Sequence, residues 1–309
     1  MKYRQLGRSG LSVSVVGLGC NNFGGSFGGK LDVDGTRAVV DTAIECGINL
    51  LDTANSYGDR GGSETLLGEV LKGRRDQVVL ATKFGSDMGE GPDVPRASRW
   101  YIKRAVEDSL RRLQTDHIDL YQLHRPDGIT PVEETLAALD DLVRDGKVLY
   151  IGSSNFAAWQ VLDADWVART TGTSRFISAQ NHYSLLERKA EDELVPACEK
   201  VGVGILPFFP LANGLLTGKY RKDQERPTGT RMEGRDISDR TWDKVENLVA
   251  FAEERGHTVL ELAFSGLLAS PAVSSVIAGA TRPEQVKSNA ASADWELSEE
   301  DRDTLRRVR

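Results

Sequence analysis

The chain alternates short apolar runs of strand length with longer segments of helical periodicity, and this rhythm continues from one end to the other. Eight strands that alternate with helices predict a parallel sheet covered by helices. An open doubly wound sheet and a closed (β/α)8 TIM barrel both fit this order. The count of eight and the lack of a boundary linker favour the barrel, as one α/β domain over residues 1–309. The strand-like runs are Val13–Gly17, Ile48–Asp52, Val78–Thr82, Ile118–Leu123, Val148–Ser153, Ile177–Gln180, Gly204–Phe208 and Ser275–Ala278.

Helix-start and helix-stop signals bound the segments between these strands. Pro131 stands at an expected first turn with Glu133 and Glu134 behind it, and glycines follow many of the helices. The stretch from Ala212 to Arg240 departs from the rhythm, because it is polar and has no clear period; a loop of this length is usually functional or mobile. The predicted helices are Asp34–Cys46, Ser63–Leu71, Ser98–Leu113, Pro131–Arg144, Ala157–Arg169, Glu187–Lys200 and Thr258–Ala269.

The composition argues against several classes of protein. The net charge is -7 and the isoelectric point is about 5.3, which disfavours a general affinity for nucleic acid or for an anionic membrane surface. No signal-like segment follows Met1, and no apolar run approaches the roughly 18 residues of a membrane span. The three cysteines (Cys20, Cys46 and Cys198) form neither a disulfide framework nor a metal motif. We therefore expect a soluble cytoplasmic protein without a bound metal.

Polar side chains stand at the ends of the predicted strands. The second, third and fourth strands end at Asp52, Lys83 and His124, and Tyr57 follows the second strand by a short loop. Each of these residues alone is more simply explained as a structural or solvated residue. In a barrel, however, the C-terminal ends of all the strands meet at one face, here called the barrel mouth, where active sites lie. The architecture therefore groups these four residues into one candidate site.

Together these four side chains suit the reduction of a carbonyl group. A free tyrosine has a pKa near 10, which a neighbouring ammonium lowers by stabilising the phenolate. A carboxylate beside the lysine keeps that ammonium charged, and a neutral histidine donates a hydrogen bond to a carbonyl oxygen that gains negative charge. No side chain supplies hydride, so this chemistry implies a nicotinamide cofactor.

Several motifs carry a family resemblance over nearly the whole chain. They are "KYRQLGRSGLSVSVVGLG", "LDTANSYG", "ATKFG", "DHIDLYQLHRPD", "GKVLYIGSSNF", "QNHYSLL", "GLLTGKY" and "IAGATRPEQVKSN". With these motifs the sequence resembles the aldo-keto reductases. The resemblance implies a (β/α)8 barrel that reduces a small carbonyl substrate, with Asp52 holding Lys83, Lys83 tuning the proton donor Tyr57, and His124 orienting the carbonyl.

The resemblance also implies how the cofactor is held. Residues after the fifth and sixth strands would bind the nicotinamide carboxamide, and Phe208 would stack on the ring. This chain reads "FFPL" where the family usually has Tyr-Ser-Pro-Leu, Ser288 where many members have Glu, and Gly279 where many have Lys. The implied cofactor contacts are Cys20, Asn21, Ser153, Ser154, Asn155, Gln180, Phe208, Leu211, Gly214, Leu216, Gly279, Arg282, Gln285 and Asn289.

NADPH is the expected nicotinamide cofactor. Its 2′-phosphate needs a local cation in an acidic protein, and the Arg282 guanidinium can meet phosphate oxygens with two parallel hydrogen bonds. Pro283 marks an expected first helical turn, whose backbone N–H groups would help to hold the anion. An exposed arginine beside a helix start is the alternative explanation of Arg282.

Two other classes of protein fit parts of the sequence. Aldo-keto folds also serve as redox-sensing auxiliary subunits of potassium channels, which keep the same four residues. An aldolase- or isomerase-like phosphate barrel is disfavoured by Phe208, because its phosphate loop would not need a stacking aromatic. Turnover of NADPH with a panel of aldehydes would separate the three classes.

Two features invite other interpretations. "GLGCNNFGGSFGG" lacks the G-x-G-x-x-G spacing of a dinucleotide fingerprint, so Asn22 and Phe23 are better read as part of a loop that lines the site. His182 and His124 lack a third metal ligand, so His182 is expected to be an exposed loop residue.

The sequence leaves the substrate and the oligomeric state open. Specificity in this fold lies on loops, here Phe23–Phe27, Phe84–Trp100 and Ala212–Arg240. The aromatic residues Phe27, Phe84 and Trp100 suggest an aromatic or aliphatic carbonyl compound.

Overall fold

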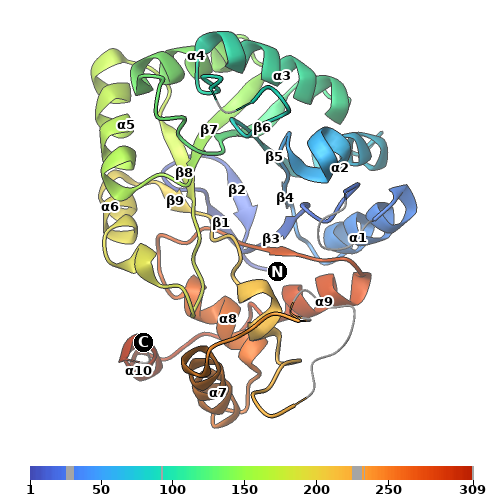
Figure 1. Cartoon of the computed structure of the whole chain (residues 1–309), viewed down its shortest axis with the longest axis vertical. Coiled ribbons are helices and arrows are strands. Elements are labelled where there is room, and N and C mark those ends of the chain that lie inside the picture. The colour runs from blue at the N-terminus through green and yellow to red at the C-terminus, as the bar shows by residue number, and fades with distance from the viewer. Residues whose placement is uncertain (26–30, 92, 225–231, 233, 308–309) are drawn as a thin grey trace.

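The fold is built on a parallel sheet wrapped in helices (Figure 1). It is seen in a computed structural model that describes residues 1–25, 31–91, 93–224, 232 and 234–307. Within these residues eight strands form one sheet in the order β10-β3-β4-β5-β6-β7-β8-β9. The strands are β3 (Val16–Gly19), β4 (Leu50–Asp52), β5 (Val79–Phe84), β6 (Ile118–Leu123), β7 (Val148–Ser154), β8 (Phe176–Gln180), β9 (Gly204–Ile205) and β10 (Val276–Gly279).

Hydrogen bonds also join the two edges of this sheet. Ile205 of β9 forms a parallel bridge with Val273, just before β10. The Ile277 N–H of β10 donates to the Pro207 carbonyl at 3.2 Å. The sheet therefore closes on itself, and the predicted (β/α)8 barrel is confirmed.

A short hairpin covers the N-terminal end of the barrel. Strands β1 (Tyr3–Gln5) and β2 (Ser12–Ser14) pair antiparallel, and Leu6 and Val13 are buried in one apolar cluster with Leu50, Ala81, Leu120, Leu206 and Ile277. The predicted strand Val13–Gly17 is therefore wrong as a single element. Its first residues belong to the hairpin, and its last two belong to the barrel strand β3.

Helices surround the barrel strands, and α9 packs beside α1 to complete the ring (Figure 1). Their inward faces and the outer face of the sheet share the largest apolar cluster. The ring contains α1 (Val33–Glu45), α2 (Tyr57–Val70), α3 (Arg99–Leu113), α4 (Val132–Arg144), α5 (Ala158–Thr171), α6 (Leu194–Val201), α8 (Val259–Leu268) and α9 (Pro283–Ala291).

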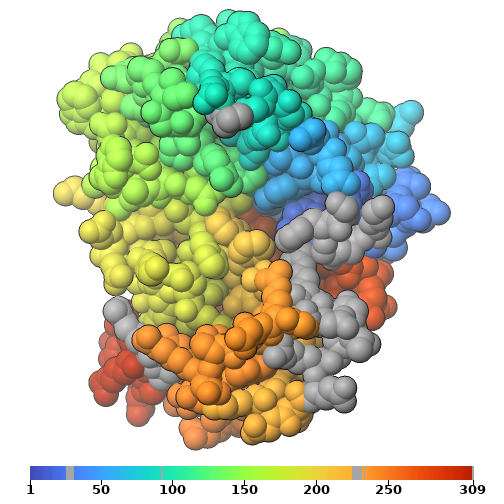
Figure 2. Space-filling model, in the orientation of Figure 1, coloured from blue at the N-terminus to red at the C-terminus, as the bar shows by residue number. Residues whose placement is uncertain are grey.

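Additional elements lie between β9 and β10 and at the C-terminal end. The 3-10 helix η3 (Ala212–Thr217) and α7 (Asp239–Glu253) precede α8, and α10 (Glu299–Arg307) ends the described chain. They share a second apolar cluster that includes Leu216, Trp242 and Leu305. Figure 2 shows that α7 and its surroundings, in orange, cover the lower part of the face in view. Two short 3-10 helices complete the fold, η1 (Arg75–Gln77) and η2 (Lys189–Glu191).

Three predicted boundaries differ from the structure for identifiable reasons. The helix predicted over Glu187–Lys200 is split into η2 and α6, and Pro196 sits in the first turn of α6, where a missing N–H is tolerated. Strand β9 ends at Ile205 because Pro207 has no N–H for the ladder. The stretch Ala212–Arg240, predicted to be irregular, contains η3 and the start of α7, while part of it lies outside the described residues.

No helix in the described part of the chain is long and apolar enough to cross a membrane. Cys20, Cys46 and Cys198 are all free thiols.

Candidate active site

A polar layer fills the barrel interior at its mouth. Asp52 and Lys83 lie two residues after the apolar Leu50 and Ala81, so they are on the same face of their strands as these residues. In the sheet, Lys83 of β5 pairs with Gln122 of β6. Asp52, Lys83, Gln122 and Gln180 are each at most 3% exposed. Burying this many polar groups is unfavourable unless they form hydrogen bonds, and these four side chains are hydrogen-bonded to one another.

The centre of this layer is an ion pair. Lys83 Nζ donates to Asp52 Oδ2 and to the Thr53 carbonyl, both at 2.8 Å. The other carboxylate oxygen of Asp52 accepts from Gln180 Nε2 at 2.8 Å and from Gln122 Nε2 at 3.4 Å. Burial by itself would lower the pKa of Lys83, but Asp52 and then Tyr57 outweigh burial and raise that pKa. Lys83 is therefore a fixed, charged ammonium at neutral pH.

Tyr57 lies beside this ammonium. Lys83 Nζ is 4.9 Å from the centre of the Tyr57 ring. Tyr57 begins α2, but Gly58, Asp59, Arg60 and Gly61 have left-handed φ values, so the regular helix starts close to the predicted Ser63. A Cβ on Gly58 would lie 2.5 Å from the Phe23 carbonyl oxygen, so only glycine fits this turn. This non-helical turn therefore places the Tyr57 phenol at the barrel mouth, and the regular helix begins only after the turn.

The pKa of Tyr57 is higher than the sequence predicted. Burial raises this pKa, the Lys83 ammonium lowers it, and the Asp52 carboxylate raises it again, so the net pKa is above the ordinary value. The expected net lowering is therefore wrong, because burial outweighs the ammonium. Tyr57 is protonated at neutral pH, and Lys83 still makes the phenolate easier to form than burial alone would allow.

His124 faces Tyr57 from the end of β6. The two rings meet edge to face, with centroids 5.8 Å apart and planes at 80°. Burial, then the charges of Lys83 and Arg125, lower the pKa of His124 to about 3. His124 is therefore a neutral imidazole at physiological pH, which can donate one ring N–H to a carbonyl oxygen.

The predicted carboxamide contacts gather at the C-terminal ends of β7 and β8. Asn155 takes up a left-handed conformation (φ 58°), and its Nδ2 donates to the His124 carbonyl at 2.9 Å and to Ser154 Oγ at 3.1 Å. Gln180 has one amide hydrogen on Asp52. Ser153 is fully buried, and its Oγ donates to the Ser178 carbonyl at 3.2 Å. The polar groups that remain at this position are the amide oxygens of Asn155 and Gln180, the second amide hydrogen of Gln180 and the Ser154 hydroxyl.

The residues predicted to hold the rest of a cofactor lie in two places. Phe208 is half-buried after β9, and Leu211 and Gly214 belong to η3 and its approach, whereas the Leu216 side chain is fully buried in the second apolar cluster. Leu216 is 0% exposed and its backbone N–H donates to the Leu211 carbonyl at 3.2 Å, so neither its side chain nor its N–H is free to meet a ligand.

The second place is the end of β10 and the start of α9. Gly279 and Arg282 are exposed, and Arg282 is the N-cap of α9 with Pro283 in the first turn, as predicted. Gln285 Oε1 accepts from the Thr281 N–H at 2.7 Å, and Asn289 is 6% exposed. From the first barrel strand, Asn21 approaches the same place: a Cβ on Gly279 would lie 3.5 Å from its Oδ1. Cys20, by contrast, is fully buried and close to Asp52.

His182 is exposed, as predicted, and it stacks on Phe208 with ring centroids 5.5 Å apart and planes at 9°. Within the described ranges no three His, Cys, Asp or Glu side chains gather in a way that could hold a metal ion. Phe27, one of the predicted substrate-loop aromatics, lies outside the described residues.

Three residues of this region were not predicted from the sequence. Gln122 points inward with Leu120 and His124, a period-two pattern that could have identified it. Ser86 Oγ lies 2.9 Å from His124 Nδ1. Lys219 brings an ammonium next to Gly214, since a Cβ on that glycine would be 3.9 Å from Lys219 Nζ.

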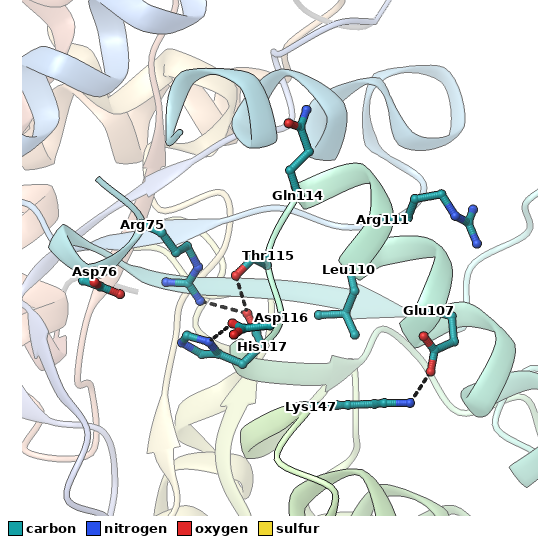
Figure 3. Close-up of a pocket in the computed structure, with 10 residues that line it drawn as sticks. All are labelled: Arg75, Asp76, Glu107, Leu110, Arg111, Gln114, Thr115, Asp116, His117 and Lys147. Carbon is teal, nitrogen blue, oxygen red and sulfur yellow. Dashed lines mark hydrogen bonds and ion pairs between the residues drawn. The ribbon is translucent and has the colours of Figure 1, made fainter. Parts of the chain in front are cut away.

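A large surface cavity lies at the other end of the barrel. It measures about 880 Å³ and is lined by residues that precede β5, β6 and β7 (Figure 3). Lys147 forms an ion pair with Glu107 there, and His117 Nδ1 lies 2.7 Å from an Asp116 carboxylate oxygen. Arg75 contacts Asp119 at 2.6 Å. This cavity shares no residue with the mouth and adds nothing to its chemistry.

Fold and site together define a class of protein. It is a (β/α)8 barrel whose mouth holds a buried carboxylate–lysine pair, a protonated tyrosine and a neutral histidine.

The chain belongs to the aldo/keto reductase family, whose model matches residues 15–309. It is 39% identical to an uncharacterized oxidoreductase of Bacillus subtilis, YrpG, over 97% of this chain and 93% of the relative. It is 36% identical to a probable voltage-gated potassium channel subunit beta of rice (Oryza sativa subsp. japonica), over 95% and 92%. It is 33% identical to L-glyceraldehyde 3-phosphate reductase of Escherichia coli K12, over 94% and 86%.

Proposed function

We propose that this protein is an NADPH-dependent reductase that converts an aldehyde or ketone to an alcohol. The observation that carries the proposal is the buried Asp52–Lys83 pair beside Tyr57, with the neutral His124 ring in edge-to-face contact with the phenol. We further propose that residues 1–309 act as one domain, and that the three free thiols reflect a reducing cytoplasm.

A nicotinamide bound at the mouth would supply the hydride. Tyr57 then donates its proton to the carbonyl oxygen, and the phenolate left behind is stabilised by Lys83. Asp52, with Gln122 and Gln180, holds Lys83 in place and charged. His124 donates its ring N–H to the same oxygen and stabilises the negative charge that develops there.

The residues at the C-terminal ends of β7 and β8 fit a nicotinamide carboxamide. A carboxamide NH2 needs acceptors, and its C=O needs a donor. Both amide hydrogens of Asn155 are already used, which leaves its Oδ1 as an acceptor. Gln180 offers its Oε1 and also its second amide hydrogen, while Ser154 Oγ accepts from Asn155 and keeps its own hydrogen to donate. The free groups are therefore two acceptors and two donors, which can complement the NH2 and the C=O of the carboxamide.

Phe208 would give the nicotinamide ring an apolar face to stack on, with His182 stacked against it. Lys219, beside Gly214, would place a cation near the pyrophosphate if η3 covers it.

We predict a preference for NADPH over NADH that depends on Arg282. The guanidinium is exposed at the N-cap of α9, where it and the first backbone N–H groups would face a 2′-phosphate. Arg282→Ala should lower the ratio of kcat/KM for NADPH to that for NADH by about tenfold to a hundredfold. Lys287→Ala, an exposed cation later on the same helix, is the matched control and should leave the ratio unchanged. Equal use of both cofactors by the wild type would reject this role.

The neutrality of His124 gives a prediction on pH. Because its pKa is about 3, far below that of a free histidine, lowering the pH from about 7 to about 5 should not protonate it. The kcat for reduction should therefore stay level over this range. A decline in kcat that follows a midpoint near 6.5 and disappears in His124→Gln would contradict a neutral imidazole at this position.

A redox-sensing channel subunit remains the second candidate, favoured by the relative named as a potassium channel beta subunit. The deciding experiment follows NADPH oxidation spectroscopically with a panel of carbonyl compounds. The panel should contain aliphatic and aromatic aldehydes and, because of the glyceraldehyde-phosphate reductase relative, a small phosphorylated aldehyde. Steady turnover with any member supports the enzyme. Tight NADPH binding with no turnover across the panel supports the subunit.

A further inference from the structure

His124 is held by the neighbouring strand β5 and by two loops, which follow β5 and β7. Its backbone N–H donates to the Phe84 carbonyl at 2.7 Å, and its carbonyl accepts from Asn155 Nδ2 at 2.9 Å. Its ring has a separate partner, Ser86, whose Oγ lies 2.9 Å from Nδ1. The backbone contacts fix where His124 sits, and the serine contact concerns the imidazole itself.

The chain after β5 is shaped to bring Ser86 to this ring. Gly85 has a φ of 97°, a backbone conformation that residues with a Cβ rarely adopt, so this turn strongly favours glycine. Next along, the Ser86 carbonyl accepts from the Tyr101 hydroxyl at 3.5 Å, which ties the loop to α3. The Gly85 turn before Ser86 and the hydrogen bond from Tyr101 to its carbonyl therefore hold Ser86 in place.

The direction of the Ser86–His124 hydrogen bond decides what the histidine can do. A neutral imidazole carries one N–H. If Nδ1 carried it and donated to Ser86, then Nε2 would present a lone pair to a substrate oxygen and repel it. If Ser86 donates to Nδ1, the hydrogen resides on Nε2, the nitrogen left free, and can be donated to the substrate.

We propose that Ser86 is a positioning residue that donates its hydroxyl hydrogen to His124 Nδ1 and thereby fixes the tautomer with hydrogen on Nε2. The inference rests on the proposed carbonyl reduction for its consequence, but the tautomer itself is a property of the free protein. The proposed role gives Ser86 no direct part in the reaction, because it acts through its hydrogen bond with His124.

The first test does not depend on turnover. The chain has four histidines, so nitrogen-15 labelling of histidine gives a simple imidazole spectrum, and His124→Gln assigns the His124 signals by their loss. In the wild type at neutral pH we expect Nδ1 to be unprotonated and Nε2 to carry the hydrogen. In Ser86→Ala the signals should move toward the averaged values of a tautomer mixture, and in Ser86→Thr, which keeps a hydroxyl, they should stay. A wild-type spectrum with hydrogen on Nδ1 overturns the proposal.

The second test measures rate. Ser86→Ala should lower kcat for carbonyl reduction by about tenfold to a hundredfold, the range found for partners that orient metal-bound histidines, with the NADPH dissociation constant unchanged. Ser86→Thr should recover most of the rate. Ser56→Ala is the matched control, since Ser56 stands next to Tyr57 and its hydroxyl makes no capping hydrogen bond. Full kcat in Ser86→Ala overturns the proposal.

The two tests separate the possible failures. If the wild type turns over no carbonyl compound, the proposed function fails while the nitrogen-15 spectrum still decides the tautomer. If Ser86→Ala does not fold, the wild-type and Ser86→Thr spectra decide it.

Discussion

Replacing Tyr57 with phenylalanine is expected to reduce kcat for carbonyl reduction by at least about a hundredfold, because general acid catalysis contributes roughly 10²–10⁴-fold. The phenol is the group whose environment is built for proton transfer: it is protonated at neutral pH, and Lys83 lies 4.9 Å from its ring. The substitution removes one oxygen and keeps the ring, so the contact with His124 survives. Single-turnover measurements with saturating NADPH would isolate the chemical step.

Cofactor binding provides the control for this variant. The groups that fit a nicotinamide come from the ends of β7, β8 and β9, so Tyr57→Phe should bind NADPH about as tightly as the wild type. Tyr150→Phe is a matched variant at the opposite end of the barrel, where Tyr150 packs against the cluster around Leu6, and it should keep full activity. Retention of more than about a hundredth of kcat in Tyr57→Phe would exclude Tyr57 as the sole proton donor.

The sequence predicted the site's location because its key residues adjoin strong strand signals. Asp52 ends β4 and His124 follows β6 directly, so locating the strands also located these side chains. Lys83 lies one residue inside β5 instead of at its end. Because successive side chains of a strand point to opposite faces, the Lys83 side chain points into the barrel, where it contacts Asp52.

Other features could not be obtained in this way. The net pKa of Tyr57 depends on how burial and the Lys83 charge balance, and sequence gives the charges without the burial. Ser86 lies 38 positions from His124, and nothing local marks their contact. Helix α7, by contrast, was missed although Ser238 caps it and Trp242, Val245 and Val249 follow at helical spacing; the polar stretch before it obscured its start.

Replacing Lys83 with methionine should both destabilise the protein and change its pH dependence. The change leaves the Asp52 carboxylate buried at 3% exposure with only amide donors, and breaking a buried pair costs about 3–5 kcal/mol. Denaturant unfolding would measure this loss. The double variant Asp52→Asn Lys83→Met removes the unpaired charge and should regain much of the stability without regaining the rate.

The pH profile tests the electrostatic role of Lys83 separately from stability. The ammonium lowers the pKa of Tyr57 against the upward effect of burial, so removing it must raise that pKa further. Protonated Tyr57 then persists to higher pH, and the high-pH decline of kcat should move upward in Lys83→Met, while the lost stabilisation of the phenolate lowers kcat at every pH. The Asp52 carboxylate raises the pKa of Tyr57, so the double variant, which lacks that charge, should have a lower Tyr57 pKa than Lys83→Met. The high-pH decline of kcat in the double variant should therefore lie between those of the wild type and Lys83→Met. A high-pH decline that stays at the wild-type position in both variants would show that Lys83 holds the site together without tuning the proton donor.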